Sequence, residues 1–144
     1  MKLAETGCEV EVVNRKSYDL LVNGNVRVEV KSGKYEDGYA AASFGKGGQI
    51  RDAKFDYCIF VSYDGYEERE ILVFTRDELR EVANKPRGRG VVRYPRTNPC
   101  ILLRYDNMKD YYADIEQGER LDIEVEIHKH PERFLDRLDK ITTQ

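Results

Sequence analysis

The chain has 144 residues and a mass of 16.8 kDa, a length that fits one domain over residues 1–144. Hydrophobic residues make up 40% and charged residues 35%, which argues against disorder and is typical of a globular protein with a charged surface. No apolar run approaches the roughly 20 residues that span a bilayer, and the first residues lack the apolar segment of a secretory signal. We therefore expect a cytoplasmic protein with no membrane partner.

The expected elements alternate between strands and short helices in a mixed α/β order. A helix end is expected over residues 2–6, closed by Gly7 as a left-handed cap. Strands are expected over 8–13, 18–22, 26–32, 39–44, 55–63 and 71–74. The 55–63 strand is the most apolar and is expected to be central. A short helix is expected between the glycines at 45–48 and about residue 54.

The second half is expected to begin with a helix over 76–83, with Thr75 as N-cap and Glu78 completing a capping box. A strand pair is expected from Val91–Tyr94 and Ile101–Tyr105, followed by an alternating strand over 121–127. A last helix is expected to start at Pro131, with an apolar stripe of Phe134, Leu135, Leu138 and Ile141.

The types of reactive residue restrict the possible chemistry. The three cysteines, Cys8, Cys58 and Cys100, are widely spaced without a CxxC pair, which argues against a disulfide framework and a zinc site. The two histidines, His128 and His130, lie together, so a Ser-His-Asp triad has little to work with. Hydrolytic chemistry would therefore depend on carboxylates, lysine and a bound metal.

Positive charge is concentrated in one stretch, because no acid occurs from residue 82 to residue 105. This basic stretch fits a nucleic-acid backbone, but its arginines could equally pair with the acidic stretch over 106–126. Candidate backbone-binding residues in and before it are Lys46, Arg51, Lys85, Arg87, Arg89, Arg93 and Arg96.

The segment 18–32, YDLLVNGNVRVEVKS, predicts a hairpin around an Asn-Gly turn. If the loop is the three residues 23–25, Val22 faces Val26 and Asp19 lies directly across from Glu29. A two-residue loop would put the apolar faces out of step, so burial of the valine and leucine face favours the three-residue loop. Two carboxylates opposite each other repel, and they require a compensating positive charge. Lys31 supplies one on the same face, and a divalent cation would supply a stronger one.

Asp19 followed by Glu29-Val30-Lys31 after a hairpin resembles the PD-(D/E)xK signature of the restriction-endonuclease-like nuclease superfamily. The resemblance covers about residues 1–63 and implies an αβββαβ core, a mixed central sheet flanked by helices. Residues 64–144 would form an extension with the basic stretch and the C-terminal helix. The resemblance implies metal ligands at Asp19, Glu29, the Val30 carbonyl and Glu5, and catalytic roles for Asp19, Glu29, Lys31 and Gln49.

The implied activity is cleavage of DNA phosphodiester bonds by a homodimer that depends on Mg²⁺ or Mn²⁺. Holliday-junction resolvases and restriction or intron-encoded endonucleases both remain open as subfamilies, and so does the choice between DNA and RNA. Two alternatives involve no chemistry. One is an inactive nuclease-fold module that binds DNA or a partner, and the other is a charged, solvated sheet face.

Overall fold

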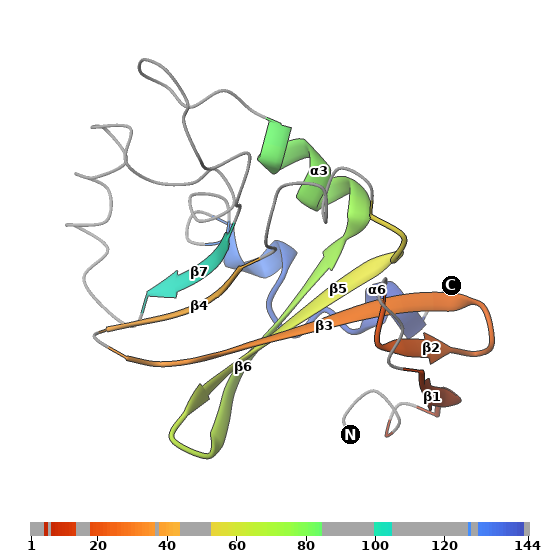
Figure 1. Ribbon diagram of the computed structural model, residues 1–144, viewed down its shortest axis with the longest axis horizontal. Helices are drawn as coiled ribbons and strands as arrows, with labels where there is room; N and C mark the ends of the chain where they lie inside the picture. Colours follow the sequence, from red (N-terminus) through yellow and green to blue (C-terminus); the bar gives the residue numbers. More distant parts are fainter. Residues whose placement is uncertain are drawn as a thin grey trace.

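A computed structural model describes residues 5, 7–13, 18–36, 38–43, 53–84, 100–104, 127 and 130–142. Within these residues the chain is mixed α/β, with a five-stranded mixed sheet, a two-stranded sheet and short helices (Figure 1). In this described part no helix is long and apolar enough to cross a membrane. The five-stranded sheet positions Asp19, Glu29 and Lys31.

The five-stranded sheet has the strand order β1-β2-β3-β5-β6. Its strands are β1 (Val10–Val12), β2 (Leu20–Val22), β3 (Val26–Lys34), β5 (Tyr57–Asp64) and β6 (Glu67–Thr75). β3 and β5 run parallel, and the other neighbouring pairs are antiparallel. The predicted strand over 55–63 is therefore interior, but the middle strand is β3.

The turn between β2 and β3 has the predicted three-residue loop. Val22 pairs with Val26, and Leu20 pairs with Val28. Asn23 and Gly24 have φ angles of 51° and 75°, so both residues take the left-handed conformation that asparagine and glycine tolerate best. The register that was inferred from burial of the apolar face is confirmed.

The segment between β3 and β5 carries β4 (Tyr39–Ser43), which pairs antiparallel with β7 (Cys100–Arg104). The β7 strand was predicted, but its predicted partner over 91–94 lies outside the described residues. The short helix expected to end near residue 54 also lies mostly outside them, and residues 53–55 are not helical. Figure 1 shows the β4–β7 ribbon beside the main sheet, with β4 running back after a turn at the end of β3.

Two hydrophobic cores cover opposite faces of the five-stranded sheet. The first core consists of Ala40, Ala53, Phe55, Cys58, Phe60, Leu72, Phe74, Leu79, Ile101, Leu103, Ile127 and Phe134. The second core consists of Leu20, Val22, Val26, Val28, Tyr57, Ile59, Ile71, Val73 and Ile141. The alternation of side chains along β5 and β6 divides their residues between the two cores.

Helix α3 (Arg76–Asn84) begins with the predicted capping box. The Glu78 N–H donates to Thr75 Oγ1 at 3.0 Å, and the Thr75 N–H donates to Glu78 Oε1 at 2.9 Å. Near the start of the chain, Glu5 is helical and Gly7 has a φ of 90°. These values agree with the predicted helix end that Gly7 closes as a left-handed cap.

The predicted C-terminal helix is wrong as a single element. The segment forms a 3₁₀ turn, η1 (Pro131–Arg133), and a short helix, α6 (Asp139–Thr142). Between them, Phe134 O accepts from the Val73 N–H at 2.8 Å, and the Asp136 N–H donates to Ile71 O at 2.8 Å. The backbone thus pairs with the outer edge of β6, and Asp136, with a φ of 53°, interrupts the helix.

The predicted strand over 121–127 is described only at Ile127, where the structure is helical instead. The buried Ile127 side chain packs in the first core. The prediction relied on alternating apolar and acidic residues. This local pattern does not specify which part of the fold buries Ile127, and so it does not determine the element that carries it.

Candidate active site

One face of β3 carries Arg27, Glu29 and Lys31, because alternate residues of a strand project from the same side. The register with β5 pairs Glu29 with Cys58 and Lys31 with Phe60. Both partners belong to the first core, and laterally paired residues share a face of the sheet. These polar β3 side chains therefore lie on the side covered by the first core.

Asp19 is held against β3 by two backbone contacts. Its N–H donates to Val28 O at 2.9 Å, and its carboxylate oxygen Oδ2 accepts from the Val30 N–H at 2.8 Å. The Asp19 carboxyl also lies close enough to the Glu29 carboxyl to raise its pKa. The predicted meeting of these two acids across the turn is therefore confirmed.

Lys31 completes the group. Its Nζ lies 3.9 Å from Glu29 Oε1, and the Lys31 and Glu29 side chains are only 20% and 17% exposed. Charged side chains are rarely buried to this extent unless they are paired or perform a function. This burial argues against the alternative of a fully solvated charged face.

The contact perturbs Glu29 strongly. Burial, followed by the hydrogen bond and the negative charge of Asp19, raises the pKa of Glu29 to about 7, although Lys31 acts in the opposite direction. The two acids therefore come together most easily when a proton or another cation neutralises part of their charge. On the neighbouring strand, burial above all raises the pKa of the Cys58 thiol, which pairs laterally with Glu29, so this cysteine is not a ready nucleophile.

The donor set fits a divalent cation in part. Two carboxylates in contact suit Mg²⁺, which takes its remaining ligands from water and phosphate oxygens. In the part of the chain that the structure describes, no group of three His, Cys, Asp or Glu side chains is arranged to hold a metal ion. Glu5 is exposed, and the structure does not join it to Asp19 and Glu29. Val30 lies between Glu29 and Lys31 on β3, with its N–H bound to Asp19.

The other residues predicted for catalysis or nucleic-acid binding lie outside the described residues. They are Gln49, Lys46, Arg51, Lys85, Arg87, Arg89, Arg93 and Arg96. Their roles stay predictions from the sequence.

An ion pair next to the acids was not predicted. Arg27 donates from Nε to Asp56 Oδ2 at 3.3 Å and from Nη2 to Asp56 Oδ1 at 3.0 Å, and its backbone N–H donates to Oδ2 at 2.9 Å. Burial alone would raise the pKa of Asp56, but these hydrogen bonds and the charges of Arg27 and Arg76 lower it overall. The alternation of charged residues at 27, 29 and 31 was the available signal, whereas the partner at 56 is distant in sequence.

A glycine lies on the same face just beyond Lys31. A Cβ atom on Gly33 would lie 2.6 Å from the backbone oxygen of Ala41 and 2.9 Å from its nitrogen. The absence of a side chain therefore lets β4 cross close over β3 next to the acid pair. A glycine inside a strand was a usable sign of such an approach.

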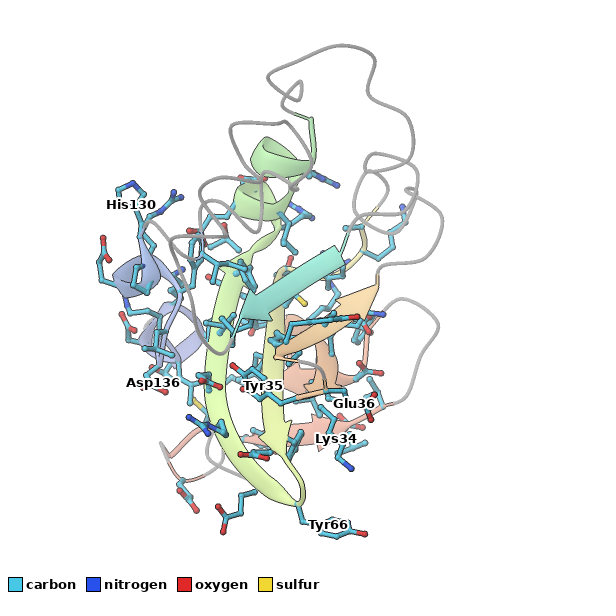
Figure 2. All side chains as sticks on the ribbon, turned by 90° about the vertical axis from the view of Figure 1, so that its left-hand side faces the viewer. Lys34, Tyr35, Glu36, Tyr66, His130 and Asp136 are labelled. Atoms are coloured by element: carbon cyan, nitrogen blue, oxygen red, sulfur yellow. The ribbon has the colours of Figure 1, made fainter. Side chains whose placement is uncertain are left out.

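Beyond Gly33, the next position on this face holds Tyr35. Its hydroxyl donates to the Glu70 carboxylate at 3.2 Å, and the buried Ser62 hydroxyl also binds that carboxylate. Burial, followed by the charge of Glu70, raises the pKa of Tyr35, so the phenol stays neutral. Figure 2 shows Tyr35 over the sheet, whereas Lys34 and Glu36 point away from it.

No protein-family model matches the chain, and no curated protein sequence matches it. The functional argument therefore rests on the geometry of this face.

Proposed function

We propose that the protein is a metal-dependent endonuclease that hydrolyses phosphodiester bonds in DNA, with a restriction-endonuclease-like core. The single observation that carries the proposal is the half-buried approach of the Asp19 and Glu29 carboxyls beside Lys31. The order of three antiparallel strands, a crossover and a strand parallel to the third agrees with the strand part of an αβββαβ core. That agreement supports the resemblance at the level of topology.

In the proposed mechanism Asp19, Glu29 and the Val30 carbonyl would hold Mg²⁺ or Mn²⁺. A bound ion of this kind polarises a phosphodiester and lowers the pKa of a coordinated water. The Val30 N–H fixes the Asp19 carboxylate, so this acid is oriented before any ligand arrives. Lys31 is assigned the stabilisation of the negative charge that develops on the phosphate oxygens.

The partners follow from the substrate. A duplex has two strands and the chain offers one such acid pair among its described residues, so we propose a homodimer that cuts both strands. The basic stretch, outside the described residues, is proposed to bind the backbone through Lys85, Arg87, Arg89, Arg93 and Arg96, with Lys46 and Arg51 contributing. The proposed setting is the cytoplasm.

The test is cleavage of plasmid DNA, branched DNA and RNA with Mg²⁺, with Mn²⁺ or with EDTA. We expect metal-dependent cleavage of DNA that is lost in Asp19→Asn, Glu29→Gln and Lys31→Met. Asp139→Asn is a matched control, because it removes a carboxylate from the distant C-terminal segment, and it should cleave like the wild type. Cleavage that persists in all three site variants would refute the assignment.

The second candidate is an inactive module with the same fold that binds DNA. The observation that favours it is the absence, within the described residues, of a third acidic, histidine or cysteine ligand beside Asp19 and Glu29. Titration calorimetry with Mn²⁺ distinguishes the two proposals. A nuclease should bind the ion in a manner that Asp19→Asn abolishes, whereas an inactive module should bind DNA without binding the ion at this site.

A further inference from the structure

We infer that Arg27, held in place by Asp56, binds the phosphate next to the one that reacts. This inference deepens the proposed function by assigning a substrate-binding residue beside Asp19, Glu29 and Lys31. It concerns binding of the nucleic-acid backbone and does not require the metal.

The first argument is position. Arg27 projects from the same face of β3 as Glu29 and lies two residues before it, a separation of about 6.6 Å along a strand. This separation is comparable to the distance between neighbouring phosphates along one nucleic-acid strand. A backbone whose reactive phosphate lies at Glu29 and Lys31 therefore presents its next phosphate near Arg27.

The second argument is the set of donors that remain. Asp56 engages Nε and Nη2 of the guanidinium, and Nη1 makes no hydrogen bond within the described residues. The Arg27 side chain is 36% exposed, so a ligand can reach it. An arginine has five N–H donors in a rigid plane, and a carboxylate on one edge orients the others without using them all.

The third argument is charge. Asp56 is close enough to Arg76 for that guanidinium to lower the pKa of the carboxyl, as Arg27 also does. Two guanidinium groups therefore act on the one Asp56 carboxylate. The Arg76 Nε is buried and, in the described part of the structure, has no hydrogen-bond partner. The positive charge of the exposed Arg27 guanidinium, next to the acid pair, favours an anionic group of the substrate.

An anion site at the start of α3 is the alternative to a site on Arg27. A shallow depression of about 460 Å³ lies beside it, lined by Asn25, Val26, Asp56, Tyr57, Thr75, Arg76 and Asp77. Thr75 Oγ1 already accepts from the Glu78 N–H of α3 there, and Asp56 O accepts from the Arg76 N–H, so the helix end offers few donors to an anion. The exposed guanidinium of Arg27 is the better candidate.

The experiment measures binding of a fluorescent DNA duplex in EDTA over a range of salt concentrations. Arg27→Gln should weaken the affinity for DNA about tenfold, as expected for a lost charged hydrogen bond. It should also reduce the salt slope, the slope of log affinity against log salt concentration, by about 1 in magnitude. Arg137→Gln is the matched control. Arg137 is 41% exposed and also binds an aspartate, Asp139, through Nε and Nη2, but it lies in the C-terminal segment. This control should bind DNA like the wild type.

Cleavage kinetics provide an independent readout. Because Arg27 would bind the substrate equally in the ground and transition states, Arg27→Gln should raise KM and leave kcat nearly unchanged. If circular dichroism shows that Arg27→Gln is unfolded, Arg27→Lys replaces it. The lysine keeps the charge, so it should keep the salt slope but lose affinity.

The inference is overturned if the folded Arg27 variant binds like the wild type, or if Arg137→Gln loses as much affinity. It is also overturned if the wild type does not bind DNA. Failure of the nuclease proposal gives a different result, since a wild type that binds DNA through Arg27 without cutting it would retain the Arg27 assignment and lose the catalytic one.

Discussion

The contact between Glu29 and Asp19 makes the metal-free fold sensitive to pH. An ordinary unfolded glutamate has a pKa of about 4.3, whereas the pKa of Glu29 in the fold is about 7. Between these values the folded state holds more protons than the unfolded state, so stability falls as pH rises. The acid pair therefore destabilises the metal-free fold at neutral and higher pH. A pair that destabilises the fold is better explained as a binding site than as a stabilising element.

We predict that Glu29→Gln is more stable than the wild type in EDTA at pH 8, by about 2 kcal/mol, because the amide removes a half-buried charge that also repels Asp19. The difference should shrink towards pH 5, where the wild-type carboxyl is protonated and no longer repels Asp19. Urea denaturation at the two pH values measures both free energies of unfolding. A difference that does not vary with pH would contradict the prediction.

The ion pair of Asp56 with Arg27 should have the opposite dependence on pH. The pKa of Asp56 is lowered in the fold, so its contribution to stability is present above its ordinary pKa and is lost as pH falls through the folded value. We predict that Asp56→Asn destabilises the protein by about 1 kcal/mol at pH 7. In denaturation experiments the gap between the variant and the wild type should begin to narrow below about pH 4, the ordinary pKa of an aspartate, and close as pH falls through the lowered pKa of Asp56. A gap that does not narrow over this range would exclude the ion pair as the cause.

Among the elements, the approach of β4 to β3 depends on one missing side chain. We predict that Gly33→Ala costs about 3 kcal/mol of unfolding free energy, because its Cβ would meet the backbone of Ala41, which is fixed by pairing with β7. Gly24→Ala is the comparison. Gly24 has a φ of 75° but open space around its Cβ position, so only backbone strain of about 1 kcal/mol is expected there. Equal costs in thermal or urea denaturation would contradict the clash.

The elements that the sequence predicts correctly are those determined by local chemistry. The Asn-Gly turn sets the register of β2 and β3, and with it the meeting of Asp19 and Glu29. Likewise, the spacing of Thr75 and Glu78 specifies the start of α3. Local chemistry could not reveal the close approach of Gly33 to β4, because it involves a strand that is paired with residues about 60 positions further along the chain.

The C-terminal segment shows why an apolar stripe in the sequence can predict the wrong element. Phe134 packs in the first core and Ile141 in the second, so the chain has to pass around the outer edge of β6 to reach both faces. A straight helix with both residues on one stripe would serve only one face. Pairing of residues 134–136 with β6 also satisfies an otherwise open sheet edge. Tertiary packing therefore overrides the helical pattern.

At the scale of the whole molecule, the same segment links the two faces of the sheet. Lys140 Nζ donates to Glu78 Oε1 at 2.9 Å and to Val73 O at 3.0 Å, which ties α6 to the first turn of α3. The Lys140 and Glu78 side chains are only 13% and 18% exposed, so water screens this ion pair little. Figure 2 places His130 and Asp136, in this segment, along one side of the main sheet. We therefore expect the segment to dock as one unit.

A double substitution tests that expectation. Phe134→Ala and Ile141→Ala should each cost about 2–4 kcal/mol of unfolding free energy, since each leaves a cavity in a different core. Residues on opposite faces of a sheet would ordinarily have additive effects. If the segment docks as one unit, the first substitution loosens its whole attachment, and the second then removes a contact that is already weakened. The double variant should therefore lose at least 1 kcal/mol less than the sum of the single losses in urea denaturation, and additivity within about 0.5 kcal/mol would show that the two ends dock independently.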